Sequence, residues 1–201
     1  MPFSLAPTRR QFVTTGLAAL AATPLVGRPL AAAAPEGWVL PEEHLPRIVR
    51  LGTRLDPFEL HVDPNSFALY WTLEGDKAIR FAVGVGRGDL YLPGVFHVGA
   101  KKEWPSWTPT REMIARDPGH YAKYADGMPG GPTNPLGARA IYLFDEVRGD
   151  TFLRIHGTPE PWTVGSAVSN GCVRLVNEHV SALYDMVPLG ARVVLHTKRA
   201  A

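Results

Sequence analysis

Cysteine is almost absent from this chain of 201 residues, which has a single one, Cys172. One thiol cannot form an internal disulfide, whereas small exported domains usually either pair their cysteines or lack them. A lone cysteine is most often a small buried apolar residue. The alternative is a reactive thiol. The cysteine count alone leaves both interpretations open.

The sequence also lacks the usual metal-binding patterns. It has no HExxH motif, no paired CxxC motif and no carboxylate-rich loop, so we expect neither a metal nor another cofactor. Six of the seven histidines are expected to be surface or packing residues: His44, His61, His97, His120, His179 and His196.

No apolar run in the sequence is long enough to predict a membrane span. Residues 12–26 are modestly apolar, follow the pair Arg9-Arg10 and precede the small residues 31–34. This order is typical of a secretory signal, and the arginine pair resembles a twin-arginine export signal. We therefore predict that residues 1–34 are a signal peptide, with no stable membrane span after its removal.

An excess of positive charge is missing once that segment is set aside. Residues 1–34 contain Arg9, Arg10 and Arg28 and no acidic residue, so removing 3 of the 21 basic residues leaves 18 against 19 acidic ones. Nucleic-acid binding requires a basic surface. The composition thus argues against a nucleic-acid partner.

Turn-forming residues are abundant, with 20 glycines and 19 prolines, which favours short strands over a helical bundle. The length fits one domain, preceded by a lead-in segment at residues 35–55 with a helical turn around residues 42–50. Helical periodicity after Asn177, a suitable N-cap, predicts one helix directly after the cysteine. Strands are predicted at residues 58–62, 67–73, 78–85, 95–99, 140–144, 151–155 and 192–196.

Residues 101–137 are rich in proline and aromatic residues, with one short helical candidate at residues 111–116. A loop this long is uncommon in a compact domain unless it has a function. Its composition is equally consistent with a lid or wall over a cleft and with a packed insertion.

Two short motifs contain groups suited to nucleophilic catalysis. Residues 155–158 read Ile-His-Gly-Thr, and residues 169–175 read Ser-Asn-Gly-Cys-Val-Arg-Leu. A free thiol has a pKa near 8.5, so it needs a base such as His156 to become a nucleophile at neutral pH. A carbonyl such as that of Gly157 would orient the imidazole. The backbone amides of Gly171 and Cys172 could stabilise an oxyanion.

These motifs, in this order, resemble the catalytic domain of the L,D-transpeptidase (YkuD) family. The resemblance extends over most of residues 58–196, through the strings at residues 84–87, 94–96, 104–109 and 134–139. It implies a mostly β, sandwich-like domain at residues 56–198. The long loop would border its cleft, and one helix would follow the nucleophile.

The resemblance also assigns roles to individual residues. Cys172 matches the nucleophile and His156 the general base and acid, with Gly157 as the carbonyl that orients the histidine. Gly171 would supply an oxyanion amide. Three more positions are implied to contact substrate: Ser169, Asn170 and Arg174. Many relatives have a second histidine where this chain has Asn170; this position does not supply the base, so the mechanism would be kept while substrate preference or rate could differ. Arg174 could equally be a structural ion-pair partner.

In the implied reaction, the cysteine attacks a peptidoglycan tetrapeptide stem and forms a thioester. An amine acceptor then resolves the thioester, which gives a 3-3 cross-link, attaches an acceptor such as an envelope protein, or exchanges an amine. The implied location is the periplasm or cell envelope. Two alternatives stay open: a cysteine L,D-carboxypeptidase or amidase that hydrolyses the same peptides, and a catalytically silent wall-binding module.

Overall fold

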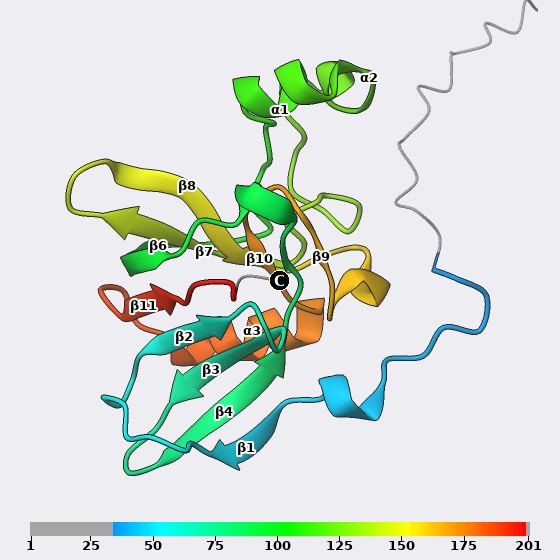
Figure 1. The fold of residues 1–201 in the computed structure, drawn as a ribbon. Helices are drawn as coiled ribbons and strands as arrows, with labels where there is room; N and C mark the ends of the chain where they lie inside the picture. Colours follow the sequence, from blue (N-terminus) through cyan, green and yellow to red (C-terminus); the bar gives the residue numbers. More distant parts are fainter. Residues whose placement is uncertain (1–33, 200–201) are drawn as a thin grey trace, which may run out of the picture.

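A computed structural model describes residues 34–199 of the chain, and nearly the whole predicted signal peptide lies outside this range. Strands dominate the described part, which confirms the prediction of a mostly β fold (Figure 1). The strands are β1 (Arg47–Arg50), β2 (Leu60–Asp63), β3 (Ala68–Thr72), β4 (Lys77–Ala82), β5 (Val85–Gly86), β6 (Gly94–Glu103), β7 (Arg139–Asp145), β8 (Gly149–His156), β9 (Ala167–Ser169), β10 (Val173–Arg174) and β11 (Arg192–Leu195). The α-helices are α1 (Arg111–Arg116), α2 (Pro118–Tyr121) and α3 (Asn177–Met186). The 3₁₀ turns are η1 (Glu42–His44), η2 (Gly88–Leu90), η3 (Ala122–Tyr124) and η4 (Pro161–Thr163).

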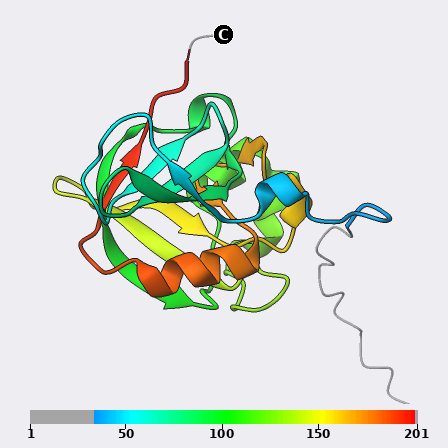
Figure 2. The same ribbon diagram turned by 90° about the horizontal axis from the view of Figure 1, so that it is seen from below.

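Within the described residues, nine strands form one sheet in the order β1-β4-β3-β2-β11-β6-β7-β8-β10, and β5 pairs with β9 separately. Leu69 and Phe81 from the first half of the sheet pack in the same core as Ile141 and Ile155 from the second half. Because both halves bury side chains in one core, the sheet folds over on itself into a sandwich-like arrangement. Figure 2 shows α3 along one side of this body.

The sequence predicted most strands correctly, but the short strands β9 and β10 were not predicted, and two further segments differ. Strand β6 runs to Glu103, several residues beyond the predicted end, and its last residues pair with β7. These residues carry charged and mostly exposed side chains, so they give no hydrophobic alternation. In the lead-in, helical structure is limited to η1, and β1 pairs antiparallel with β4. Pro46 disfavours helical geometry at the preceding residue and cannot continue the turn.

Helix α3 follows the cysteine as predicted, and Val180 and Leu183 anchor it in the core. The prediction that Asn177 caps it was wrong. The cap is Val176, which makes no side-chain hydrogen bond, and Asn177 is the first helical residue. Asn177 Oδ1 instead accepts a hydrogen bond from the Ala138 amide, at 2.9 Å. Its side chain thus ties α3 to the start of β7.

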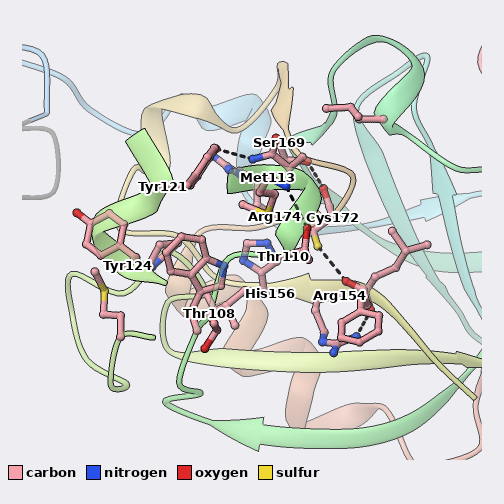
Figure 3. Close-up of a pocket in the computed structure, with 18 of the residues that line it drawn as sticks. Thr108, Thr110, Met113, Tyr121, Tyr124, Arg154, His156, Ser169, Cys172 and Arg174 are labelled. Atoms are coloured by element: carbon pink, nitrogen blue, oxygen red, sulfur yellow. Dashed lines mark hydrogen bonds between the residues drawn. The ribbon is translucent and has the colours of Figure 1, made fainter. Parts of the chain in front are cut away.

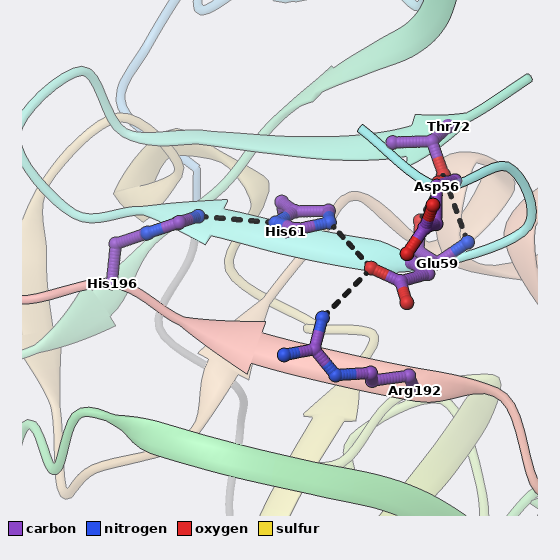
Figure 4. A network of polar contacts seen from close by, with 6 residues as sticks. All are labelled: Asp56, Glu59, His61, Thr72, Arg192 and His196. Atoms are coloured by element: carbon purple, nitrogen blue, oxygen red, sulfur yellow. Dashed lines mark hydrogen bonds and ion pairs between the residues drawn. The ribbon is translucent and has the colours of Figure 1, made fainter. Parts of the chain in front are cut away.

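A chain of polar contacts joins β2 to β11, which run parallel. Arg192 donates to Glu59 at 2.9 Å, and His61 Nε2 lies 3.1 Å from the same carboxylate. His61 Nδ1 lies 3.2 Å from Nε2 of His196 (Figure 4). The buried His61 ring therefore has partners at both nitrogens, and Arg192 balances the carboxylate charge.

The long segment after β6 folds into α1, α2 and η3, which stand above the sheet at the top of Figure 1. Helix α1 covers the predicted residues 111–116, and Thr110 caps it. Helix α2 was not predicted from the sequence, although it begins with Asp117 as N-cap and Pro118 at its first position. Both are recognised helix-start signals. Among the described residues, no helix is long and apolar enough to span a membrane.

Candidate active site

A cavity of about 990 Å³ lies between the sheet and the helical segment. His156, Ser169, Cys172 and Arg174 line it from the side of the sheet. Residues of the long segment line the opposite wall, among them Thr108, Thr110, Met113, Tyr121 and Tyr124 (Figure 3). The structure therefore supports the interpretation of this segment as a wall over a cleft.

Strand pairing brings the histidine and the cysteine to this cavity. Strands β8 and β10 are parallel, with Ile155 opposite Val173 and His156 opposite Arg174. Cys172 directly precedes β10, so it lies at the edge of the strand pair that carries His156. Figure 3 shows both side chains at the cavity. The loop of residues 157–171 makes this parallel crossover possible.

The imidazole of His156 is buried and held at one nitrogen. Its Nδ1 lies 2.5 Å from the carbonyl oxygen of Gly157. Because a carbonyl only accepts, Nδ1 carries the proton and Nε2 keeps its lone pair. Burial, followed by the charges of Arg174 and Arg154, lowers the pKa of His156 to about 3, against the raising effect of the Gly157 carbonyl. The ring is therefore neutral at physiological pH.

Cys172 is partly buried, and its Sγ lies 3.8 Å from the carbonyl oxygen of Phe152. Burial raises the pKa of the thiol; a hydrogen bond from the backbone of Arg154 and the charges of Arg154 and Arg174 oppose this. The resting pair is thus a neutral thiol and a neutral imidazole. Phe152 has a φ of 60°, a strained value for a bulky residue that turns its carbonyl toward the thiol.

Ser169 shapes the loop that carries the cysteine. Its hydroxyl donates to the Cys172 carbonyl at 2.5 Å and accepts from the Gly171 amide at 3.2 Å. Gly171 has a φ of 125°, and a Cβ there would lie 2.9 Å from the Leu90 carbonyl oxygen, so this position requires glycine. The Gly171 amide is engaged inside the loop. The Cys172 amide has no hydrogen-bond partner among the described residues.

Gly157 also has no room for a side chain. A Cβ there would overlap Asn177 Oδ1 and lie 3.1 Å from the Ala138 nitrogen. Asn177 thus packs directly against the residue whose carbonyl holds His156. The first turn of α3 therefore fixes the orientation of the imidazole through the backbone of Gly157.

Two arginines bring positive charge to the site. Arg154 is paired with both oxygens of Asp150, at 2.7 and 2.8 Å. Arg174 is mostly buried but poorly paired, with Glu160 at 3.9 Å and Thr163 Oγ1 at 3.4 Å. Its Nε has no hydrogen-bond partner in the described part of the chain, and burial lowers the pKa of the guanidinium. A buried guanidinium with unused donors is suited to bind a carboxylate.

Asn170 does not point freely into the cavity. Arg116 donates to its Oδ1 at 2.9 Å, and its Nδ2 donates to Tyr121 Oη at 2.7 Å. No group of three or more potential metal-binding side chains occurs in the part of the chain that the structure describes.

Comparison with known proteins identifies the family. The sequence profile of the L,D-transpeptidase catalytic domain, YkuD, matches residues 57–195. The chain belongs to this family.

Curated relatives carry the same family name. A putative L,D-transpeptidase of Fuscovulum blasticum, from an ATP synthase gene region, is 38% identical over 138 residues, which cover 67% of each protein. The probable L,D-transpeptidase ErfK/SrfK of Escherichia coli is 33% identical over 155 residues, 74% of this chain and 45% of the relative. The chain thus spans two thirds of one relative and less than half of the other.

Solved structures agree with the fold. A Brucella melitensis protein described as a probable carnitine operon oxidoreductase is 44% identical, with a TM-score of 0.54 over 81% of this chain and 96% of that one. The avibactam carbamoyl enzyme of Ldtfm is 16% identical, with a TM-score of 0.53 over 72% of this chain and 51% of that one. The second likeness concerns the fold alone.

In this L,D-transpeptidase domain, the structure brings to the site four residues that were not predicted from the sequence: Arg116, Tyr121, Phe152 and Arg154. Arg154 was recognisable, because residues two apart on a strand share a face and it precedes His156 by two positions. The other three gave no signal, since a strained backbone and contacts across a long loop leave no local pattern.

Proposed function

We propose that this chain is an exported L,D-transpeptidase that acts on peptidoglycan tetrapeptide stems through a thioester on Cys172. Membership of the family supports this assignment. The single observation that carries the proposal is the meeting of Cys172 and His156 at one cavity, with His156 Nδ1 bound to the Gly157 carbonyl. This arrangement leaves Nε2 as a proton acceptor on a ring of fixed orientation.

In the first step, His156 Nε2 takes the proton of the Cys172 thiol as the sulfur attacks the donor peptide. The attacked carbonyl follows the L-centre of the diaminopimelate residue. The imidazolium then gives its proton to the departing amine, so D-alanine leaves and a thioester remains. Because Arg174 and Arg154 disfavour the imidazolium, they make it a strong acid toward that amine, while they stabilise the thiolate.

In the second step, the amine of another stem attacks the thioester carbonyl. His156 accepts a proton from this amine and returns one to the sulfur, which restores the thiol and gives a 3-3 cross-link. The negative oxygen in each tetrahedral intermediate needs hydrogen-bond donors. Within residues 34–199 the Cys172 amide has no hydrogen-bond partner, so it can donate directly. The Gly171 amide would first have to leave Ser169.

Arg174 is the best candidate for binding a substrate carboxylate, because it lines the cavity and its contact with Glu160 is long, at 3.9 Å. The hydroxyl of Ser169 is occupied inside the loop. We therefore assign Ser169 to loop positioning and Arg174 to recognition.

Acylation of the thiol can be tested by intact-mass spectrometry after treatment with a carbapenem. The wild type should gain one adduct and Cys172→Ala none, while His156→Gln should react much more slowly. His196→Gln changes a histidine outside the cavity and should react like the wild type. An adduct on Cys172→Ala would contradict the assignment of the nucleophile.

The type of reaction can be tested with tetrapeptide stems, with and without an acceptor amine. A cross-linked or exchanged product together with free D-alanine supports transpeptidation. Tripeptide alone would favour the L,D-carboxypeptidase or amidase alternative. If Cys172→Ala kept both sacculus binding and the cellular phenotype, a silent wall-binding module would be favoured.

We also propose export to the periplasm or cell envelope through a twin-arginine-type signal in residues 1–34. Replacing Arg9 and Arg10 by lysine keeps the charge and should retain the protein inside the cell. Unchanged export of this variant, measured by cell fractionation, would contradict the proposal.

A further inference from the structure

Asn170 links the loop that carries Cys172 to the helical segment across the cavity. We call residues 111–124, which comprise α1, α2 and η3, the flap. Arg116, in the last turn of α1, donates to Asn170 Oδ1, and Asn170 Nδ2 donates to the hydroxyl of Tyr121 at the end of α2. One amide thus binds two flap helices at once, only two residues from the thiol.

The flap has little else to hold it over the cavity. None of its helices contains a fully buried residue. Its aromatic contacts are made mainly by Trp107 at its base, which lies against the rings of Tyr121 and Tyr124. Among the described residues, the two bonds of Asn170 are the only side-chain hydrogen bonds between the flap and the loop of residues 169–172. A segment with few buried contacts opens at low cost in free energy.

We propose that Asn170 is a positioning residue that latches the flap over Cys172 and so controls which molecules reach the thiol. We call the two hydrogen bonds of Asn170 to Arg116 and Tyr121 the latch. With the latch closed, Tyr121 and Arg116 form part of the wall of the cavity. When both bonds break, the flap can swing about its base and widen the entrance. The role of this latch in admitting peptide stems rests on the proposed function, whereas its effect on access to the thiol does not.

The donor and acceptor roles of the Asn170 side chain predict that two substitutions at this position have opposite effects. Asn170→Ala removes both bonds. Asn170→Asp keeps an acceptor for Arg116, now charged, and can accept from the Tyr121 hydroxyl, which rotates to donate. The alanine variant should therefore open the flap, and the aspartate variant should hold it closed.

Access can be measured directly, because Cys172 is the only cysteine. Full-length protein is labelled with a bulky maleimide and with the small reagent iodoacetamide, and both rates are followed by mass spectrometry. Tyr121→Phe and Arg116→Ala should each speed maleimide labelling about fivefold, the factor for one net hydrogen bond. Asn170→Ala should be labelled by the maleimide as fast as the Tyr121→Phe/Arg116→Ala double variant. Introducing Asn170→Ala into that double variant should not raise the rate further. Arg111→Ala, at an exposed position on the same helix, is the matched control.

The latch predicts a larger effect on the bulky reagent than on the small one. Equal acceleration of both reagents would mean that the reactivity of the thiol itself had changed, which would overturn the proposal. Unchanged labelling in Asn170→Ala, Tyr121→Phe and Arg116→Ala, or the same acceleration in Arg111→Ala, would also overturn it. Labelling needs no substrate, so the latch can hold even if no D-alanine is released, and the proposed function can hold without the latch.

Discussion

Arg174 and His156 are opposite each other in the parallel pairing of β10 with β8, and the charge of the arginine lowers the pKa of the imidazole. Among the causes of that low pKa, Arg174 ranks directly after burial and ahead of Arg154. The same guanidinium favours the thiolate of Cys172. The guanidinium thus lowers the pKa of both groups: it disfavours the charged form of the base and favours the charged form of the nucleophile.

Removing this charge should raise the pKa of His156. We expect a larger upward shift in Arg174→Gln than in Arg154→Gln, and none in Arg148→Gln, which changes an exposed arginine on the β7–β8 turn. NMR titration of the His156 ring protons, assigned with His156→Gln, measures the shift. An unchanged pKa in Arg174→Gln would show that the charge of Arg174 does not reach the ring.

The neutral resting pair predicts a specific pH profile for thiol alkylation. Because burial raises the pKa of Cys172, the rate with iodoacetamide should keep rising beyond pH 9. A thiol in the unfolded chain should titrate near 8.5. The measurement compares native and urea-unfolded protein from pH 6 to 10.5. A plateau at neutral pH in the native protein would instead reveal a preformed thiolate–imidazolium pair.

His156 should also make the fold less stable in acid. Its pKa is about 3 in the folded chain and near 6.5 when unfolded, so between these values the unfolded state binds the extra proton. Its contribution is complete above pH 6.5 and falls by about 1.4 kcal/mol per pH unit on acidification. Urea unfolding at several pH values should show a shallower slope for His156→Gln. Parallel slopes for the two proteins would contradict this assignment.

The hydrogen bonds of Ser169 predict that this residue keeps the loop of Cys172 in its observed geometry. Ser169→Ala leaves the Cys172 carbonyl and the Gly171 amide without their internal partner, so we expect a loss of about 1–3 kcal/mol in unfolding free energy. Acylation by a carbapenem should slow as well. Ser181→Ala removes a hydroxyl that bonds to the Asn177 carbonyl on α3, and should leave acylation unchanged. Equal effects of Ser169→Ala and Ser181→Ala on the acylation rate would contradict a role of Ser169 in positioning the loop.

A substitution at Gly157 can test whether its carbonyl orients the His156 ring. Gly157→Ala forces a methyl group against Asn177 Oδ1, so the backbone must shift and the carbonyl that holds His156 Nδ1 must move with it. We expect a cost of about 1–3 kcal/mol in unfolding free energy and a fall in kcat. Gly52→Ala, where a Cβ meets nothing within 4 Å, is the control. Full activity of Gly157→Ala would show that this carbonyl is dispensable.

The sequence by itself determined the mostly β class, most strands, the helix after the cysteine and the two motifs around His156 and Cys172. Each of these depends on local alternation, helical periodicity or short strings of residues that are adjacent in the chain. The extension of β6 to Glu103 and the short helix α2 escaped because their residues are charged, exposed or few. Asn177 looked like a helix cap, and only its contact with the Ala138 amide revealed its actual position.

Only the tertiary structure decided which side chains meet at the cavity. Parallel pairing of β8 with β10 places Arg174 beside His156, and the folding of the long segment brings Arg116 and Tyr121 to Asn170. The low pKa of His156 likewise depends on burial and on charges from two strands. Hydrogen bonds and charge interactions act through space over a few ångströms, so partners more than 40 residues apart, such as Tyr121 and Asn170, leave no pattern in the sequence.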